Sequence, residues 1–563
     1  MEKLSKFTLA EVIKVSSGSF SERIAFSEIS GSSLTYKEFG EKVKSISAFL
    51  EERGINKGDK VALLSENKPN WGVAYFAITS MGAVVVPIMT EFSTGEIQHI
   101  IRHSGCKAIF VSAKLFEKVE DCNYEEVSTI ILIDDFSIVP PKTSNAFLKD
   151  AVKTGKREFD KILAAAYKLI SKSQRSVNED DLASIVYTSG TTGHSKGVML
   201  THKNIVHDAV ATLKMVTIVP EDRLLSILPL AHTFECTLGM IAPVISGASI
   251  YYLDRPPTAS ALLPAMGKVK PTIILSVPLI IEKIFKLKIL PELTKKPVVK
   301  TLYKFPPMRK KLHKIAGKKL LKTFGGELKL FPIGGAALAY EVERFLREAK
   351  FPYAIGYGLS ETSPVVTGDD ENNTKFRAVG RVMMGMEIKI DNPDPETGEG
   401  EVLIKGPNVM KGYYKDPETT KNVFTEDGWF KSGDLGIIDA EGYLFIRGRS
   451  KNVIIGSNGK NVYPEQIESV INDLPYVVES LVIEKEGKLV AKVNLNYEEL
   501  DEDFNLHSLP DPETRKKIKS ILDDILKTTN SRVSSFSKIN EIVEQAEPFE
   551  KTPTKKIKRY LYT

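Results

Sequence analysis

The chain has 563 residues, of which 42% are hydrophobic and 26% are charged, and its formal net charge is +5. This length is too great for one hydrophobic core and predicts roughly two to four lobes. The composition is that of an ordinary globular protein. A net charge so small for this length does not indicate a nucleic-acid-binding protein.

Cysteine content and the N-terminal sequence indicate the compartment. Cys106, Cys122 and Cys236 are widely spaced and odd in number, so they suggest neither a disulfide framework nor a zinc site. The first fifteen residues, MEKLSKFTLAEVIKV, lack the apolar core and cleavage site of a signal peptide. No run of about 18 apolar residues predicts a transmembrane helix. We therefore expect a soluble, cytoplasmic protein.

The first third of the chain alternates helix-like and strand-like segments. Phe39, Val43, Ile46 and Leu50 recur at spacings of three and four, which places them on one helical face. Short apolar runs at residues 60–64, 83–87 and 108–111 read as strands. The alternation predicts an α/β protein with a largely parallel sheet covered by helices. A segment at 141–181 interrupts it with one amphipathic helix, at about 159–170, to which we assign no chemistry.

The most informative stretch is YTSGTTGHSKG, residues 187–197, which follows a strand-like run at 183–188. Its glycines let backbone amides converge on an anion, its hydroxyl groups add donors, and Lys196 adds a mobile positive charge. The spacing is not that of a Walker A loop, because Gly197 rather than Ser or Thr follows the lysine. The alternative is a plain Gly/Ser/Thr surface loop. The residue types favour a phosphate-binding loop.

Five further motifs carry chemistry. PIGGAA at 332–337 has the small residues that a flat base needs for close approach. YGLSET at 357–362 combines an aromatic face, hydroxyls and a carboxylate, and WFKSGDLG at 429–436 presents Asp434 on a glycine-flanked turn. RGRSKNVIIGSNGKNVYPEQIE spans 447–468, and FEKTPTKKIKR spans 549–559. Each alone fits an ordinary turn or tail; together they need a common explanation.

These motifs, in this order, resemble those of the adenylate-forming superfamily of acyl-CoA synthetases, peptide-synthetase adenylation domains and luciferases. The resemblance implies an α/β fold with a large N-terminal lobe of helix-covered, mostly parallel sheets, residues 1–447. A small mobile α+β lobe, residues 448–563, would follow a hinge at 449–451 that includes Lys451. Gly456 and Gly459 of the small lobe would line the tunnel for the thiol of coenzyme A.

The same resemblance implies an ATP site. The phosphates would meet Thr188, Ser189, Gly190, Thr191, Thr192, Gly193, Lys196 and Ser360. The adenine and ribose would meet Gly334, Gly335, Ala336, Tyr357, Asp434 and Arg449. Glu361 would hold Mg²⁺ through a hard oxygen ligand, which suits that cation.

Lys556 is expected to act in catalysis together with Glu361 and Lys196. In the superfamily a lysine in a Pro-x-T-x-G-K-I-like segment contacts the carboxylate and the α-phosphate during adenylation. Lys556 precedes Ile557 as that lysine should, but Lys555 replaces the usual glycine, so the two neighbouring lysines both remain candidates. The alternative is that these residues form only a basic C-terminal tail without a catalytic role.

The acyl substrate is suggested by LPLAHTFE at 228–235, where His232 would lie near the carboxylate, and by Gly358, where a bulky residue would close the pocket. The overall pattern resembles a long-chain fatty acyl-CoA synthetase using ATP, Mg²⁺ and coenzyme A. The resemblance leaves open whether the substrate is an aromatic or other acid. It also leaves open whether acyl carrier protein replaces coenzyme A as the thiol. A nucleotide-binding protein without turnover is disfavoured because the expected catalytic residues are all present.

A basic segment at 282–322 holds fourteen Lys or Arg residues against two Glu, interleaved with apolar residues. Such a mixture fits peripheral contact with the anionic inner face of a membrane. It also fits a solvated basic surface, which is the commoner case.

Overall fold

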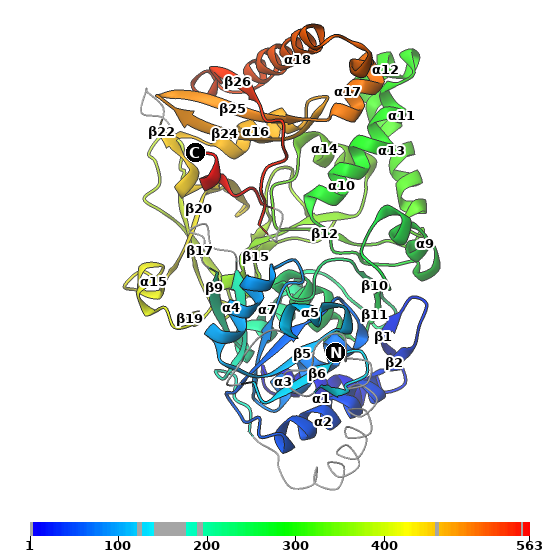
Figure 1. The fold of residues 1–563 in the computed structure, drawn as a ribbon, viewed down its shortest axis with the longest axis vertical. Coiled ribbons are helices and arrows are strands. Elements are labelled where there is room, and N and C mark those ends of the chain that lie inside the picture. Colours follow the sequence, from blue (N-terminus) through cyan, green and yellow to red (C-terminus); the bar gives the residue numbers. More distant parts are fainter. Residues whose placement is uncertain (1–3, 121–126, 140–175, 189–194, 456–460, 553–555) are drawn as a thin grey trace.

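The computed structural model describes residues 4–120, 127–139, 176–188, 195–455, 461–552 and 556–563. Figure 1 shows a large lower part that contains the N-terminal elements and a smaller upper part built from the C-terminal residues, coloured orange to red. The helix predicted at 159–170 lies outside the described residues.

An eight-stranded sheet forms the centre of the large part, in the order β19-β9-β8-β4-β3-β5-β6-β7. Strands β8, β4, β3, β5 and β6 run parallel, and β9 returns antiparallel to β8. The strands are β3 (Lys60–Leu64), β4 (Val84–Pro87), β5 (Cys106–Val111), β6 (Thr129–Leu132), β7 (Ile138–Val139), β8 (Leu182–Thr188), β9 (Lys196–Thr201) and β19 (Gly412–Tyr413). The strands predicted at 60–64, 83–87 and 108–111 are confirmed.

Both faces of this sheet are buried. Val61 and Leu63 of β3 belong to one hydrophobic cluster, and the alternating Ala62 and Leu64 belong to another. Because successive side chains of a strand point to opposite faces, helices must cover both sides. Helices α3 (Pro69–Ser80) and α7 (His202–Met215) contact strands of this sheet, and residues of α4 (Thr94–Ser104) and α5 (Glu117–Glu120) belong to the second cluster. The large part also contains α1 (Leu9–Ser19), α2 (Tyr36–Glu52) and α8 (Ala242–Ser246), of which α1 and α2 pack against α3.

Helix α2 shows why the sequence periodicity was informative. Thr35 and Glu38 form a reciprocal capping box at its start, which satisfies amide groups that the first turn leaves unpaired. Phe39, Val43 and Leu50 are at most 2% exposed, as the spacing of the apolar residues predicts.

A second sheet, β10-β11-β1-β2, and the parallel pair β12-β13 extend the large part. These strands are β1 (Ile24–Glu28), β2 (Ser33–Thr35), β10 (Arg223–Ser226), β11 (Ser249–Tyr252), β12 (Phe331–Ile333) and β13 (Tyr353–Ile355). The helices beside them are α9 (Ala259–Val269), α10 (Pro278–Ile284), α11 (Leu290–Thr294), α12 (Pro297–Tyr303), α13 (Pro306–Thr323) and α14 (Tyr340–Ala349). The basic segment thus forms most of α10 to α13, on the right of Figure 1.

Antiparallel strands lead from the large part to the small one. They are β14 (Tyr357–Gly358), β15 (Val365–Gly368), β16 (Arg381–Val382), β17 (Glu387–Asp391), β18 (Gly400–Lys405), β20 (Phe430–Ile438) and β21 (Leu444–Arg449), with α15 (Pro417–Asn422) between β19 and β20. The predicted boundary at residue 447 falls within β21, and the chain leaves this sheet at Ser450.

The C-terminal part has its own core. Its elements are β22 (Ile454–Ile455), β23 (Asn461–Val462), α16 (Pro464–Asn472), β24 (Val477–Lys485), β25 (Lys488–Leu495), α17 (Tyr497–Phe504), α18 (Asp511–Arg532) and β26 (Glu541–Glu544). A hydrophobic cluster running from Val462 to Ile539 is separate from those of the large part. None of the helices that the structure describes is long and apolar enough to cross a bilayer.

Candidate active site

A cleft of about 3510 Å³ separates the two parts. Every predicted site residue within the described parts lines it: Thr188, Lys196, His232, Gly334, Gly335, Ala336, Tyr357, Gly358, Ser360, Glu361, Asp434, Arg449, Lys451 and Lys556. The predicted residues Ser189, Gly190, Thr191, Thr192, Gly193, Gly456 and Gly459 lie outside the described residues. The structure therefore brings together residues from motifs more than 350 positions apart, while their individual roles stay predictions.

The β8–β9 hairpin carries the predicted phosphate-binding loop. Thr188 and Lys196 pair at the end of the hairpin next to that loop, and both line the cleft. The Lys196 amine lies 5.1 Å from the centre of the Tyr413 ring, within the range of a cation–π contact. The Tyr413 hydroxyl donates a 2.8 Å hydrogen bond to Glu361 Oε1. Tyr413 thus connects the predicted phosphate-binding lysine to the predicted metal ligand.

Tyr413 was missed by the sequence analysis. A signal existed in the Gly-Tyr-Tyr run at 412–414, but only the pairing of β19 with β9 places that run beside Lys196. Burial and the neighbouring Glu361 carboxylate raise the pKa of the Tyr413 phenol, so it stays a hydrogen-bond donor.

Glu361 fits the role of a magnesium ligand. No group of three or more metal-binding side chains occurs among the described residues. Magnesium commonly takes only one or two carboxylates and completes its shell with phosphate oxygens and water. The single Glu361 carboxylate, connected through Tyr413 to Lys196, meets that requirement.

A buried hydrogen-bond network holds the YGLSET motif in place. Asp208 of α7 is fully buried, and its Oδ1 accepts bonds from the Val365 amide at 3.1 Å and the Asn408 side chain at 3.0 Å. The Thr237 hydroxyl donates to the Ser363 carbonyl at 2.8 Å. Burial raises the pKa of Asp208 well above its ordinary value. Sequence reasoning did not find this support, which forms only through tertiary contacts.

The PIGGAA motif begins within β12, and the four residues that follow the strand line the cleft. Gly334 lies so close to Phe234 that a Cβ atom there would come within 3.1 Å of the ring. Gly335 has a φ of +87°, a conformation that side chains disfavour. A flat base could approach this backbone closely, as the sequence predicts.

Tyr357, Asp434 and Arg449 form one hydrogen-bonded group. The Tyr357 hydroxyl donates to Asp434 Oδ2 at 2.7 Å, and Arg449 Nε lies 2.8 Å from Asp434 Oδ1. Asp434 and Arg449 face each other across β20 and β21. Burial raises the pKa of Asp434, while Arg449 and Tyr357 oppose that shift by stabilising the carboxylate. The three residues are prearranged where the sequence predicts the ribose.

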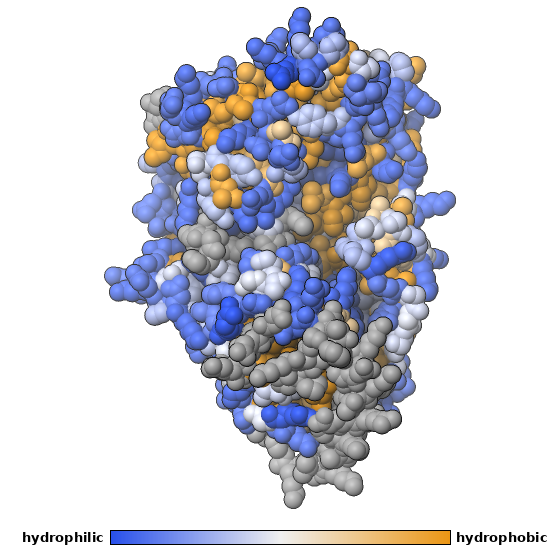
Figure 2. All heavy atoms as spheres, in the orientation of Figure 1, coloured by the Kyte–Doolittle hydropathy of each residue, from blue (hydrophilic) through white to orange (hydrophobic). Residues whose placement is uncertain are grey.

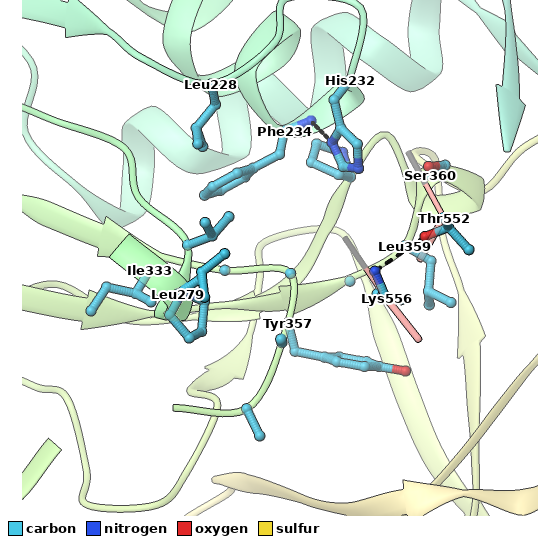
Figure 3. A pocket seen from close by; sticks show the side chains of 18 of the residues that line it. Leu228, His232, Phe234, Leu279, Ile333, Tyr357, Leu359, Ser360, Thr552 and Lys556 are labelled. Carbon is cyan, nitrogen blue, oxygen red and sulfur yellow. Dashed lines mark hydrogen bonds between the residues drawn. The ribbon is translucent and has the colours of Figure 1, made fainter. Parts of the chain in front are cut away.

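Lys556 enters the same cleft from the C-terminal part (Figure 3). Its amide donates to the Thr552 hydroxyl at 3.2 Å, and its carbonyl accepts from the Thr552 amide at 2.8 Å, which turns the chain back toward the cleft. The side chain remains open to solvent within the cleft. Protein surrounds it nonetheless, and this partial burial, with the Arg449 charge, lowers the pKa of Lys556 while Asp434 and Glu361 raise it.

His232 lies across the cleft from Lys556 in Figure 3. Burial, and then the positive charge of Lys556, lowers the pKa of His232 to about 4, so the ring is neutral near pH 7. Its Nδ1 accepts a 3.2 Å hydrogen bond from the Phe234 amide. His232 therefore lines the cleft as a neutral ring at that pH.

The segment that carries Lys556 is anchored by Arg559. Its guanidinium pairs with Glu468 of α16 and donates to the Val482 carbonyl at 3.3 Å. Sequence reasoning also missed this pair, because its two members lie in different motifs 91 positions apart.

Gly358 lines the cleft, but its lack of a side chain has a second cause. A Cβ atom at this position would lie 1.8 Å from the Pro364 carbonyl oxygen, which belongs to the backbone. Glycine is thus required by the turn between β14 and β15. The prediction that it keeps the acyl pocket open stays a prediction.

The helix-covered parallel sheets, the smaller C-terminal part and the cleft between them define the class of adenylate-forming enzymes. A sequence model described as AMP-binding enzyme matches residues 14–414, and the chain belongs to this family. The chain is 28% identical to a fatty acyl-CoA synthetase of Dictyostelium discoideum, over 98% of this chain and 88% of the relative. It is 29% identical to a chloroplastic long-chain-fatty-acid–[acyl-carrier-protein] ligase of Arabidopsis thaliana, over 93% of this chain and 80% of the relative.

Solved structures agree on the fold. An o-succinylbenzoate coenzyme A synthetase from Bacillus subtilis, in complex with ATP and magnesium ion, superimposes with a TM-score of 0.74. The match covers 98% of both chains at 23% identity. Such solved structures confirm the predicted fold class, and the match to the AMP-binding family confirms the predicted superfamily.

Proposed function

We propose that this protein activates a long-chain fatty acid with ATP and transfers the acyl group to the thiol of coenzyme A. The observation that carries the proposal is the position of Lys556 in the cleft, beside Glu361, Asp434 and Arg449. One carboxylate oxygen would attack the α-phosphate, the bond to the β-phosphate oxygen would break, and pyrophosphate would leave. The thiol would then attack the acyl carbonyl, losing its proton and releasing AMP.

The residues of the cleft would assist by alignment and charge neutralisation, since no covalent enzyme nucleophile is needed. Lys556 and Lys196 would offset charge on the phosphates, and Asp434 with Arg449 would hold the ribose. Magnesium bound to Glu361 would supply further positive charge to the phosphates. Neutral His232 would border the acid without competing for its negative charge.

The apolar wall of the cleft favours a long acyl chain. Figure 2 shows apolar side chains gathered in a hollow between the two parts, on the side of α10. The wall of the cleft includes Met215, Val216, Leu238, Ile273, Leu275 and Leu330. Burying a CH₂ group on such a wall contributes about 0.8 kcal/mol, so affinity should rise with chain length.

Two alternatives are tested by the same assay. The Bacillus subtilis neighbour is named for an aromatic acid, and the Arabidopsis thaliana relative for acyl carrier protein. We would measure AMP release with acetate, benzoate and oleate, each with coenzyme A or with acyl carrier protein. We expect turnover only with oleate and coenzyme A. A preference for benzoate would change the proposed substrate, and a preference for the carrier protein would change the proposed thiol.

We also propose that residues 448–563 rotate about Lys451 between the two steps, which would withdraw Lys556 and admit the thiol. Lys556→Ala should reduce acid-dependent ATP–pyrophosphate exchange by about 100-fold or more, because it removes a charge aimed at the developing negative charge. Conversion of a supplied acyl-adenylate to the thioester should be largely spared. Lys555→Ala is the matched comparison, and a loss confined to that variant would move the role to Lys555. Equal loss of both half-reactions would contradict this rotation between the two steps.

The surface of α12 and α13 supports a further proposal, contact with an anionic membrane. Val298, Phe305 and Ile315 are 71%, 58% and 60% exposed among these lysine-rich helices. Fourteen basic and two acidic residues give 282–322 a net charge of +12, so the remaining chain, at +5 overall, carries −7. Positive charge is therefore concentrated on one projecting edge, as peripheral binding to anionic lipid requires.

A further inference from the structure

Lys286 joins the two parts of the molecule at a distance from the predicted hinge. It lies in the helical turn Phe285–Ile289 that continues α10, and its side chain is half-buried. Its amine donates a hydrogen bond to the carbonyl oxygen of Asn472, the last residue of α16 in the C-terminal part. The carbonyl end of a helix carries partial negative charge, so a cation is favoured there.

Acidic residues from both parts surround this contact. Glu282 and Glu341 come from the large part, whereas Asp473 and Glu499 come from the C-terminal part. The pKa of Asp473 is raised to about 6, chiefly by burial; Lys286 opposes this shift, whereas Glu282 and Glu341 contribute to it. Arg532 also opposes it from within the C-terminal part. Without the Lys286 charge, Asp473 would face two carboxylates of the large part, and like charges in a half-buried interface repel.

Other hydrogen bonds between described residues of the two parts lie close to the antiparallel strands that lead from the large part to the small one. The Tyr463 hydroxyl donates to Glu399 at 2.6 Å, and the Gln466 side chain donates to the Arg447 carbonyl at 3.0 Å. Figure 1 shows α10 on the right of the molecule and β20, one of these connecting strands, on the left. Contacts beside a hinge can survive a rotation, but a contact at the far side must break. The Lys286–Asn472 contact therefore belongs to this one arrangement of the two parts and stabilises it.

We propose that Lys286 is a positioning residue that holds the C-terminal part in the arrangement in which Lys556 enters the cleft. The inference rests on the proposed function, because it assigns this closed arrangement to adenylate formation. When the C-terminal part rotates for thioester formation, the Lys286–Asn472 hydrogen bond breaks. Lys286 then favours the first half-reaction and is dispensable for the second.

The test separates the half-reactions. Lys286→Met keeps the length of the side chain and removes the charge; it should lower acid-dependent ATP–pyrophosphate exchange about tenfold, as expected for loss of a partly buried charged hydrogen bond. Thioester formation from a supplied acyl-adenylate should be unchanged. Lys288→Met is the matched control, because Lys288 is exposed in the same helical turn. Equal behaviour of the two variants, or equal loss of both half-reactions in Lys286→Met, would overturn the proposal.

A second variant approaches the contact from the other part. If repulsion of Asp473 opens the interface, Asp473→Asn should restore part of the exchange activity lost in Lys286→Met. Losses that simply add in the double variant would contradict the positioning role of Lys286. Absence of exchange in the unmodified protein would instead contradict the proposed function, so the two failures are distinguishable.

Discussion

At the scale of single residues, Asp434 is held on both oxygens, by the Tyr357 hydroxyl and by Arg449. Each of these bonds orients a carboxylate that is only 4% exposed, so it can accept hydrogen bonds from a ribose without first rearranging. Preorganisation of this kind is expected to act on the binding of ATP more than on the chemical step.

Tyr357→Phe tests this arrangement because it removes one hydroxyl and keeps the ring. We expect the KM for ATP to rise about fivefold with little change in kcat, since one hydrogen bond to a charged group contributes about 1 kcal/mol or somewhat more. Tyr443→Phe is the control, because its hydroxyl donates to the Asn373 carbonyl outside the cleft. A lower kcat with unchanged KM would assign Tyr357 to the chemical step.

His202 predicts a pH effect on stability. It is fully buried at the start of α7, and its Nδ1 accepts a 3.2 Å hydrogen bond from the Leu9 amide. Burial lowers its pKa from 6.5 to about 4, although Asp181 partly opposes the shift. Between these two pH values the unfolded chain binds more protons at this residue, so the free energy of unfolding falls as the pH falls.

His202→Gln removes this titration. Relative to the variant, the unmodified protein should lose about 2 kcal/mol more stability between pH 6.5 and pH 5, since each unit of pKa difference corresponds to about 1.4 kcal/mol. Denaturant unfolding at both pH values measures the difference. The same pH dependence in both proteins would show that His202 does not titrate in this way.

At the scale of elements, the turn between β14 and β15 depends on Gly358. A Cβ atom there meets the Pro364 carbonyl oxygen, and the backbone cannot yield as a flexible side chain would. Gly358→Ala should therefore lower the thermal midpoint and reduce ATP–pyrophosphate exchange, because the turn carries Glu361. Gly95→Ala in α4 has no atom within 4 Å of its Cβ, and it should be neutral or slightly stabilising. An unaltered Gly358→Ala protein would return this glycine to the role of an acyl-pocket determinant.

Elements with a clear hydrophobic period were predictable from the sequence, as α2 and β3 to β5 illustrate. There a local pattern of buried residues determines the element type. Several residues of the cleft, among them Lys196, Glu361 and Asp434, could also be singled out, because short runs of glycine, hydroxyl and charged residues carry their chemistry locally. Tyr413, Asp208 and the Arg559–Glu468 pair were not, since each acts through partners more than 50 positions away.

At the scale of the whole molecule, charge is distributed unevenly, and this distribution predicts how the protein meets a bilayer. Lys310, Lys311 and Lys314 are exposed on α13, and none has an ion pair among the described residues. Each lysine near an anionic surface contributes about 1 kcal/mol, so removing three should weaken binding about 100-fold. The attraction should also fall with added salt, because exposed charges are screened.

Changing Lys310, Lys311 and Lys314 together to Gln tests the charge contribution. Sedimentation with vesicles of phosphatidylcholine, alone or mixed with anionic phosphatidylglycerol, measures it. The unmodified protein should bind only the anionic vesicles, and the triple variant should lose that binding while keeping its ATP–pyrophosphate exchange. The control carries the same charge change on the C-terminal part, at Lys516, Lys519 and Lys527 of α18, which are also exposed.

Phe305→Ser separates insertion from simple electrostatic attraction. The Phe305 side chain is 58% exposed, at the corner where α12 leads into α13. If it enters the interfacial layer, its loss should weaken binding to anionic vesicles even at high salt, because burial of an apolar side chain does not depend on screening. Binding that disappears with salt and ignores Phe305→Ser would reduce the contact to charge alone. Equal binding by both triple variants would remove α13 from the contact, leaving its lysines as a solvated face.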